Sequence, residues 1–180
     1  MKSKKKIGRE KGMKQKKGII DVFDLFFEKE LFNDIVEIGT GSGNFSVYTS
    51  KKASEMGASF TTFDVKDVKP FIKNQLNKFG GIFYNEDINQ NTIIEDILKS
   101  DKRVLILNDG ALKLPQFKRF APLLKKNDCL MSHDYYKSDN DKSKGRITFG
   151  EVHEYIDKYN LKICYEKLLE TFLWLCCIKE

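Results

Sequence analysis

The sequence predicts an α/β fold in which helices cover both faces of a doubly wound, mostly parallel sheet of seven strands. Apolar segments of strand length alternate with helical segments through most of the chain. A glycine or an acid ends each of the first five strands at a regular interval. These residues are Gly39, Asp64, Asp87, Asp109 and Asp134, separated by 25, 23, 22 and 25 positions. Since one strand–helix unit has about this length, we expect each residue at the carboxyl end of a successive parallel strand.

The first half of the chain predicts three helices and two strands. Residues 19–32 place apolar side chains at helical spacing and predict a helix that packs on the sheet. Residues 34–38 predict a buried strand, and residues 58–64 predict a second because they are rich in aromatic and β-branched side chains. Further helices are expected at about 44–56 and at 70–78, where Pro70 stands near the start.

The second half continues this alternation. Strands are expected at 82–85, 103–107 and 128–132, and helices at about 90–100, 115–125 and 150–159. The polar segment 135–149 lacks periodicity and predicts a mobile loop over the ligand edge. Residues 161–165 and 171–178 predict two last strands. Their short link around Lys167 leaves no room for a crossover helix, so we expect antiparallel neighbours.

The basic charge is concentrated at one end of the chain. The net charge is +6, but residues 1–17 hold nine Lys or Arg and one acid, so the remainder carries −2. We therefore divide the chain into a basic, flexible tail at 1–17 and a single domain at 18–180. The tail is expected either to contact nucleic acid, anionic lipid or an acidic partner, or to remain a solvated leader.

Neither a membrane span nor a secretory signal is expected. The longest apolar run, residues 172–178, has seven residues, whereas a span needs about 18. The basic N-terminus has no apolar segment behind it, which excludes a secretory signal. Cys129, Cys164, Cys176 and Cys177 show no C-x-x-C spacing and stand in apolar, strand-like runs. They predict buried, reduced thiols and hence a cytoplasmic protein.

A glycine-rich bend follows the first strand. The segment DIVEIGTGSGN at residues 34–44 predicts a buried strand that turns sharply into a helix, because glycine permits positive φ and close backbone approach. The amides at the start of that helix favour a polar or anionic ligand. The spacing E-x-G-x-G-x-G, from Glu37 to Gly43, resembles the first motif of class I S-adenosylmethionine-dependent methyltransferases, which bends around methionine and ribose. A tight turn without a ligand is the alternative.

This resemblance implies a Rossmann-like sheet with strand order 3-2-1-4-5-7-6 and an antiparallel strand 7. It also implies S-adenosylmethionine as cofactor. Asp64 would accept from the ribose hydroxyls, and Asp87 from the adenine amino group. The implied cofactor-binding residues are Glu37, Gly39, Thr40, Gly41, Gly43, Phe63, Asp64, Asp87, Ile88 and Asp109. Phe63 and Ile88 would flank the adenine, and Glu37 with the glycine backbone would hold the methionine end. For one or two of the acids, a helix N-cap is the alternative role.

The segment from strand four to strand five resembles a narrower group, which includes the cephalosporin hydroxylase and rhamnosyl O-methyltransferase families. Their pattern is D-G-x-H, then L-L-K-x-G-G, then H-D-Y. The matching residues are Asp109-Gly110, Leu123-Leu124-Lys125 and His133-Asp134-Tyr135. The chain departs from the pattern at Ala111-Leu112-Lys113, where the histidine is absent, and at Asn127-Asp128, which replaces Gly-Gly.

A metal site and a base are implied in the same segment. Catechol O-methyltransferase relatives bind a divalent cation at these strand ends, and by resemblance Asp109, His133 and Asp134 would ligate Mg²⁺ or Mn²⁺. The cation would lower the pKa of a substrate hydroxyl. Lys113 is then the candidate base, although those relatives place their lysine one residue nearer the acid, and an exposed loop lysine is the alternative. Without a metal, His133 is the more natural base, and a structural histidine is its alternative.

Three functions are expected from these features. The first is O-methylation of a hydroxylated small molecule or sugar, with Asp109, Lys113 and His133 as catalytic residues. The second is a nucleic-acid or protein methyltransferase that docks through residues 1–17. Residues 108–111, however, lack the N/D-P-P-Y/F/W motif common in methylation of base amino groups. The third is a non-catalytic cofactor-binding module. The 135–149 loop, the N-terminal segment or a second subunit of an oligomer would recognise the acceptor.

Overall fold

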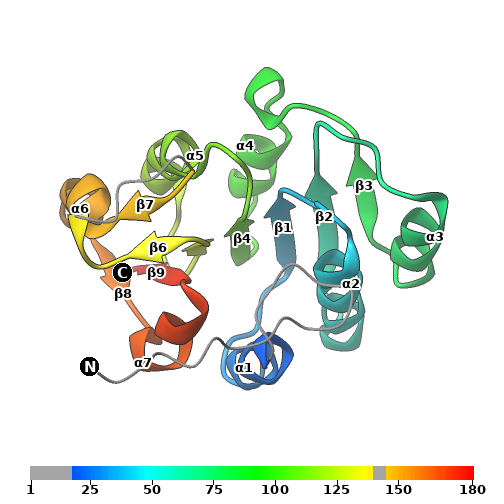
Figure 1. Ribbon diagram of the computed structural model, residues 1–180, viewed down its shortest axis with the longest axis horizontal. Coiled ribbons are helices and arrows are strands. Elements are labelled where there is room, and N and C mark those ends of the chain that lie inside the picture. The colour runs from blue at the N-terminus through cyan, green and yellow to red at the C-terminus, as the bar shows by residue number, and fades with distance from the viewer. Residues whose placement is uncertain (1–17, 140–144) are drawn as a thin grey trace, which may run out of the picture.

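Seven strands form one sheet in the computed structural model, which describes residues 18–139 and 145–180 (Figure 1). They are β1 (Asp34–Ile38), β2 (Ser59–Phe63), β3 (Ile82–Tyr84), β4 (Val104–Asn108), β5 (Cys129–Ser132), β8 (Leu161–Ile163) and β9 (Leu175–Lys179). Their order is β3-β2-β1-β4-β5-β9-β8. The strands from β1 to β5 pair in parallel, and β9 runs antiparallel to both β5 and β8. The expected order 3-2-1-4-5-7-6, with its antiparallel last strand, is therefore confirmed.

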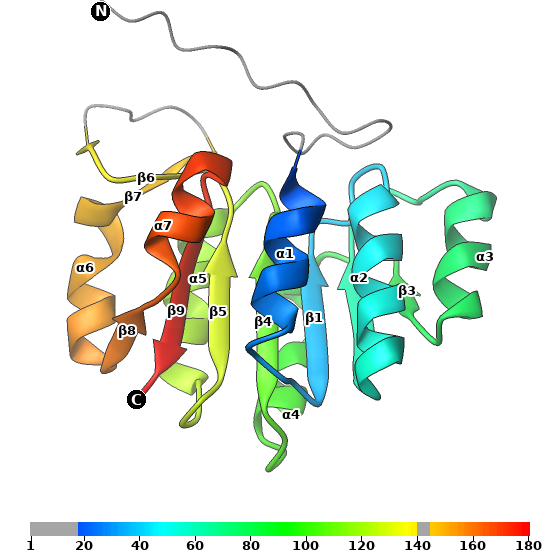
Figure 2. The same ribbon diagram turned by 90° about the horizontal axis from the view of Figure 1, so that it is seen from below.

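Helices cover both faces of the sheet (Figure 2). The helices are α1 (Ile19–Phe27), α2 (Asn44–Met56), α3 (Pro70–Lys78), α4 (Ile93–Leu98), α5 (Lys113–Phe120), α6 (Phe149–Lys158) and α7 (Glu166–Leu169). One core lies under α1, α2, α3 and α7, and the other under α4, α5 and α6. Successive strand residues alternate between the cores, so Ile35 joins the first and Val36 the second. Burial on both faces explains why the strands read as continuous apolar runs.

An aromatic group in the first core reaches the carboxyl edge of the sheet. Phe23 of α1 packs edge-on against Phe45 of α2 and against Trp174, with ring centroids 5.0 and 5.5 Å away. The Trp174 ring in turn lies 4.9 Å from the His133 ring. The packing of α1 therefore supports a residue that directly follows β5.

Three helices differ from their expected bounds by more than one residue. The helix expected at 19–32 ends at Phe27, and Arg103 holds the chain beyond it by donating to Leu31 O (3.0 Å). The helix expected at 90–100 begins at Ile93, after a separate 3₁₀ turn at Ile88–Gln90. The helix expected at 115–125 runs from Lys113 to Phe120, and a 3₁₀ turn containing Pro122, which has no amide hydrogen, follows it.

The segment expected to be an irregular loop, residues 135–149, contains two short strands. Here β6 (Tyr135–Tyr136) pairs in parallel with β7 (Ile147–Thr148), and the expectation of a loop throughout is wrong for these residues. Thr148 and Glu151 form a capping box that starts α6 at Phe149. Residues 140–144 lie outside the described part. The basic tail at 1–17 does so too, and its expected partners stay predictions.

The structure also bears on the expectations about membrane spans and cysteines. None of the helices within 18–139 and 145–180 combines the length and the apolarity that crossing a membrane requires. The four cysteines are free thiols, as expected; Cys164 is partly exposed and the other three are buried.

Candidate active site

The carboxyl ends of the parallel strands surround a cavity of about 620 Å³. All five strand-end residues line it, namely Gly39, Asp64, Asp87, Asp109 and Asp134. Small-molecule sites typically have volumes of roughly 300–1,000 Å³. The regular spacing in the sequence therefore predicted which side chains the fold brings together.

The glycine bend is held by the end of β2. Gly39 N donates to Phe63 O (2.8 Å), and Gly41 N donates to the Asp64 carboxylate (2.8 Å). The second Asp64 oxygen accepts from Lys66 N (2.9 Å). The partly exposed Asp64 therefore faces the bend, and it is the side chain that links the two loops.

Glu37 is a buried acid directly below this bend. Its side chain accepts from Thr62 Oγ1 (2.6 Å), and the residue is only 2% exposed. Burial raises the Glu37 pKa to about 7, and the charges of Asp109 and Asp64 add to the rise, although hydrogen bonds from Ser46 and Thr62 oppose it. A carboxyl group with this pKa exchanges its proton near neutral pH, so a cationic group arriving at the bend would favour its ionised form.

Asp87 and Ile88 line the cavity from the segment that follows β3. Asp87 caps the 3₁₀ turn at Ile88–Gln90, because its Oδ1 accepts from both nitrogens of Asn89 (2.9 and 2.8 Å). The capping role considered for the acids is thus realised at Asp87, which also lines the cavity. Phe63 lines the cavity as well and stacks on Tyr84, with centroids 5.1 Å apart.

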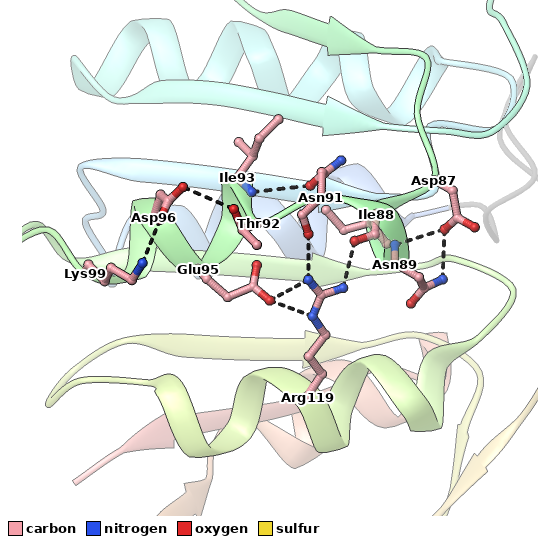
Figure 3. Close-up of polar contacts among 10 residues, drawn as sticks. All are labelled: Asp87, Ile88, Asn89, Asn91, Thr92, Ile93, Glu95, Asp96, Lys99 and Arg119. Atoms are coloured by element: carbon pink, nitrogen blue, oxygen red, sulfur yellow. Dashed lines mark hydrogen bonds and ion pairs between the residues drawn. The ribbon is translucent and has the colours of Figure 1, made fainter.

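Arg119 of α5 fastens the segment that carries Asp87 and Ile88 (Figure 3). Its guanidinium donates to Ile88 O and to Asn91 O, each at 2.7 Å, and pairs with Glu95 of α4. The backbone oxygens of an irregular turn thereby gain charged donors from a regular helix. The segment 87–91, of which Asp87, Ile88 and Asn89 line the cavity, is therefore held by α5, although Arg119 itself does not line the cavity.

Four side chains meet after β4 and β5, and we call them the strand-end cluster: Asp109, Lys113, His133 and Asp134. His133 Nδ1 and Asp109 Oδ1 are 2.8 Å apart. Lys113 Nζ donates to Gly110 O (2.8 Å) and lies 3.1 Å from Asp134 Oδ2 and 3.8 Å from Asp109 Oδ1. Lys113 is only 6% exposed, so its description as a solvated loop lysine is wrong.

Asp109, His133 and Asp134 are also the expected metal ligands. One candidate atom from each lies within 4.8 Å of the others, as a shared cation requires. The donor set as arranged does not fit a dication, however, because the Lys113 ammonium is paired with Asp134 Oδ2 at 3.1 Å. A cation is therefore already present among these oxygens.

Gly43 stands apart from the other expected cofactor residues. It does not line the cavity, whereas Glu37, Gly39, Thr40, Gly41, Phe63, Asp64, Asp87, Ile88 and Asp109 do. Gly43 starts α2 with φ 81°, and a Cβ there would lie 2.3 Å from Ile72 Cγ2. The glycine is thus required where α2 approaches α3.

Sequence reasoning missed Gln116 of α5, which lines the cavity and is 4% exposed. No described residue pairs with Gln116 Oε1, and an added Cβ at Gly110 would lie 3.0 Å from that oxygen. A buried acceptor of this kind is costly unless a ligand or water satisfies it. Its three-residue spacing from Lys113, which places both on one helix face, was the available signal.

The fold is shared with solved methyltransferases. An apo structure of CmcI aligns with a TM-score of 0.65 at 13% identity and covers 93% of this chain and 73% of that one. A putative caffeoyl-CoA O-methyltransferase from Staphylococcus aureus aligns with a TM-score of 0.57 at 16% identity, over 90% and 83% of the two chains. An S-adenosylmethionine-dependent methyltransferase from Thiobacillus denitrificans in complex with S-adenosyl-L-homocysteine gives 0.53 at 9%, over 94% of each.

No family model and no curated protein matches the sequence. At these identities the structural likeness shows the fold, which is the Rossmann-like methyltransferase fold. The resemblance to class I methyltransferases inferred from the glycine bend is confirmed at this level.

Replacement of Gly39 should destabilise the protein more than replacement of Gly41. An added Cβ at Gly39 (φ 97°) would lie 2.7 Å from Asp109 O, whereas at Gly41 (φ 57°) no described atom lies within 4 Å. We expect Gly39→Ala to lower the free energy of unfolding by roughly 2–4 kcal/mol, from strain and overlap together, and Gly41→Ala by about 1 kcal/mol. Urea denaturation measures both, and equal losses would contradict the close approach at Gly39.

Glu37→Gln should change how stability depends on pH. Because the Glu37 pKa is raised from 4.5 to about 7 in the folded state, its contribution to stability is present below pH 4.5 and is lost as the pH rises through 7. The variant should therefore exceed the wild type in unfolding free energy at pH 9, by up to about 3 kcal/mol. The advantage should shrink toward pH 5. Urea titrations at both pH values test this, with the exposed Glu154→Gln as control; a pH-independent difference would refute it.

Arg119→Gln should increase the backbone mobility of the segment 87–91. The variant loses the charged donors to Ile88 O and Asn91 O, so hydrogen exchange of the backbone amides in 87–92 should accelerate. Lys118→Gln is the matched control, since Lys118 is on the same helix and lies over the Tyr155 ring instead. Exchange rates measured by mass spectrometry that stay unchanged in Arg119→Gln would show that Arg119 does not hold this segment.

Proposed function

We propose that this chain is an S-adenosylmethionine-dependent methyltransferase that methylates a hydroxyl group of a small molecule or sugar. The observation that carries the proposal is the pairing of Asp64 with the Gly41 amide at the rim of the 620 Å³ cavity. It places a carboxylate and a glycine bend side by side, as recognition of a nucleoside with an amino-acid tail requires.

The nucleoside half has a complete set of partners in the cavity wall. Asp64 offers carboxylate oxygens to ribose hydroxyls, and Asp87 offers an acceptor for an exocyclic amino group. Phe63 and Ile88 supply apolar surface to either side of a base. Glu37, below the bend, suits the ammonium end of methionine because its raised pKa lets it ionise when a cation arrives. The residues present therefore fit the cofactor.

The acceptor half is the strand-end cluster. When bound, S-adenosylmethionine supplies an electrophilic methyl group on its sulfonium. Asp109 Oδ1 accepts from His133 Nδ1 (2.8 Å), which orients the imidazole and leaves Nε2 to take the proton of an acceptor hydroxyl. Lys113 is a weaker candidate for the base than the sequence suggested, because its ammonium is engaged with Gly110 O and Asp134.

Oxygen is the proposed acceptor atom for two reasons. A histidine–aspartate pair matches the need to deprotonate a hydroxyl near neutral pH. In addition, the Staphylococcus aureus protein that shares this fold is described as a putative caffeoyl-CoA O-methyltransferase.

Two alternatives stay open to test. A nucleic-acid or protein acceptor docked through the basic tail depends on residues 1–17, which lie outside the described part. A non-catalytic module would bind the cofactor and transfer nothing. An acceptor panel that includes a catechol, a sugar, RNA and a basic peptide separates these functions, with the labelled methyl group followed into product.

Cofactor binding should depend on Asp64. Titration calorimetry with S-adenosylhomocysteine should show Asp64→Ala binding roughly 10–100-fold more weakly than wild type, since hydrogen bonds to a charged group are lost. Asp67→Ala is the matched control, because Asp67 lies three residues on, pairs with Lys73 and does not line the cavity. A wild-type chain that does not bind S-adenosylhomocysteine, or equal affinities of the two variants, would overturn the assignment.

A further inference from the structure

The strand-end cluster contains a cation of its own. Lys113 Nζ has three oxygen neighbours: Gly110 O at 2.8 Å, Asp134 Oδ2 at 3.1 Å and Asp109 Oδ1 at 3.8 Å. Two of these oxygens belong to the group of three potential metal ligands, the one such group in the described residues. The ammonium therefore lies where a shared ion would be attracted.

The position of Lys113 is built into the fold. Asn108, which ends β4 and is fully buried, donates from Nδ2 to Lys113 O (2.8 Å) and also lies 3.2 Å from Ser132 Oγ of β5. These contacts hold the first residue of α5 against the strand ends. The Lys113 side chain is only 7% exposed, and a lysine so buried requires oxygen partners for its ammonium.

We propose that the Lys113 ammonium takes the place of a divalent cation in this chain, so that the acceptor site works without a bound metal. The part of the proposal that concerns the acceptor rests on the proposed methyltransferase function. The exclusion of a metal depends on the cluster alone.

Charge and ligand supply both disfavour a dication here. Mg²⁺ requires six oxygen ligands at about 2.1 Å in near-octahedral geometry. Asp134 Oδ2 is paired with Lys113, and Asp109 Oδ1 with His133 Nδ1. Leu112, the residue before Lys113, lines the cavity and adds no ligand atom. A dication would have to displace the ammonium from its carboxylates, and the buried ammonium would then keep Gly110 O as its one partner among these three oxygens.

The same ammonium suits the chemistry of the acceptor. Negative charge builds on the acceptor oxygen as His133 removes its proton, and a fixed cation beside it stabilises that charge without reorganisation. In this arrangement the Lys113 ammonium stabilises the negative charge on the acceptor oxygen, and His133 is the base. The absence of the histidine expected at Leu112 agrees with this arrangement, because it removes one potential metal ligand.

Binding of Mn²⁺ tests the proposal without any methyl transfer. Electron paramagnetic resonance of free Mn²⁺ should show no binding to the wild-type cluster up to the highest Mn²⁺ concentration used. Lys113→Met, which keeps the side-chain length and removes the charge, should bind Mn²⁺ with a Kd at least about tenfold below that concentration. Adding Asp134→Asn to Lys113→Met should abolish the gain. Lys118→Met, on the same helix but over Tyr155, is the control and should behave as the wild type.

The outcomes separate cleanly. Wild-type Mn²⁺ binding that Asp134→Asn removes would overturn the proposal, as would a folded Lys113→Met that binds no better than wild type. Wild-type binding that Asp134→Asn leaves unchanged lies elsewhere and counts as absence from the cluster. If Lys113→Met does not fold, the wild-type and Asp134→Asn titrations decide alone.

Activity supplies a second readout. Methyl transfer by the wild type should be unchanged in EDTA, and Lys113→Met should lose roughly 10²–10³-fold in kcat, partly restored by Mn²⁺. Loss of wild-type transfer in EDTA would refute the metal-free site. A chain that excludes Mn²⁺ yet fails to bind S-adenosylhomocysteine would instead refute the proposed function and leave the cluster's ammonium in place.

Discussion

The hydrogen-bonded register of β2, β1, β4 and β5 is the constraint on which the site depends. Ile38 is paired with Phe63 on one side and with Asn108 on the other, and Asn108 is paired with Ser132. The next residue of each strand is then tied to its neighbour, as Asp109 N donates to Ile38 O and His133 N to Asn108 O. Parallel strands that end in register deliver their following residues to one rim. A shift by one residue would send these side chains to the other face.

The rim places several like charges together, and the structure manages them by pairing. Asp64 accepts from the Gly41 amide of the glycine bend and from the Lys66 amide, and Asp109 accepts from His133. Glu37 is fully buried, and burial together with the charges of Asp109 and Asp64 raises its pKa. The Lys113 ammonium forms an ion pair with the Asp134 carboxylate. The cavity thus has an amide-lined half beside the bend and a half with a fixed cation, which matches a nucleoside at one end and an acceptor at the other.

Much of this architecture could be predicted because it follows from local pattern. Strand and helix existence, the antiparallel end of the sheet and the gathering of Asp64, Asp87, Asp109 and Asp134 came from periodicity and from equal spacing. Helix ends were predicted less well, since a long-range donor such as Arg103 or a cap such as Asp87 sets them. The ordered pair β6 and β7 was missed because short strands in a polar segment have no periodicity to detect.

The sequence by itself determined the fold class and the identity of the rim, because repeating strand–helix units admit few topologies. The strand order was implied by the resemblance of the glycine bend to the first motif of class I methyltransferases. Only the tertiary structure decided what each rim residue touches. Lys113 is buried among carboxylates rather than solvated, Gly43 serves the α2–α3 contact, and Arg119 holds a wall that it does not line. These facts depend on distances between residues 20 or more positions apart or on side-chain direction within a turn. Neither is encoded in spacing along the chain, since packing of distant segments sets both.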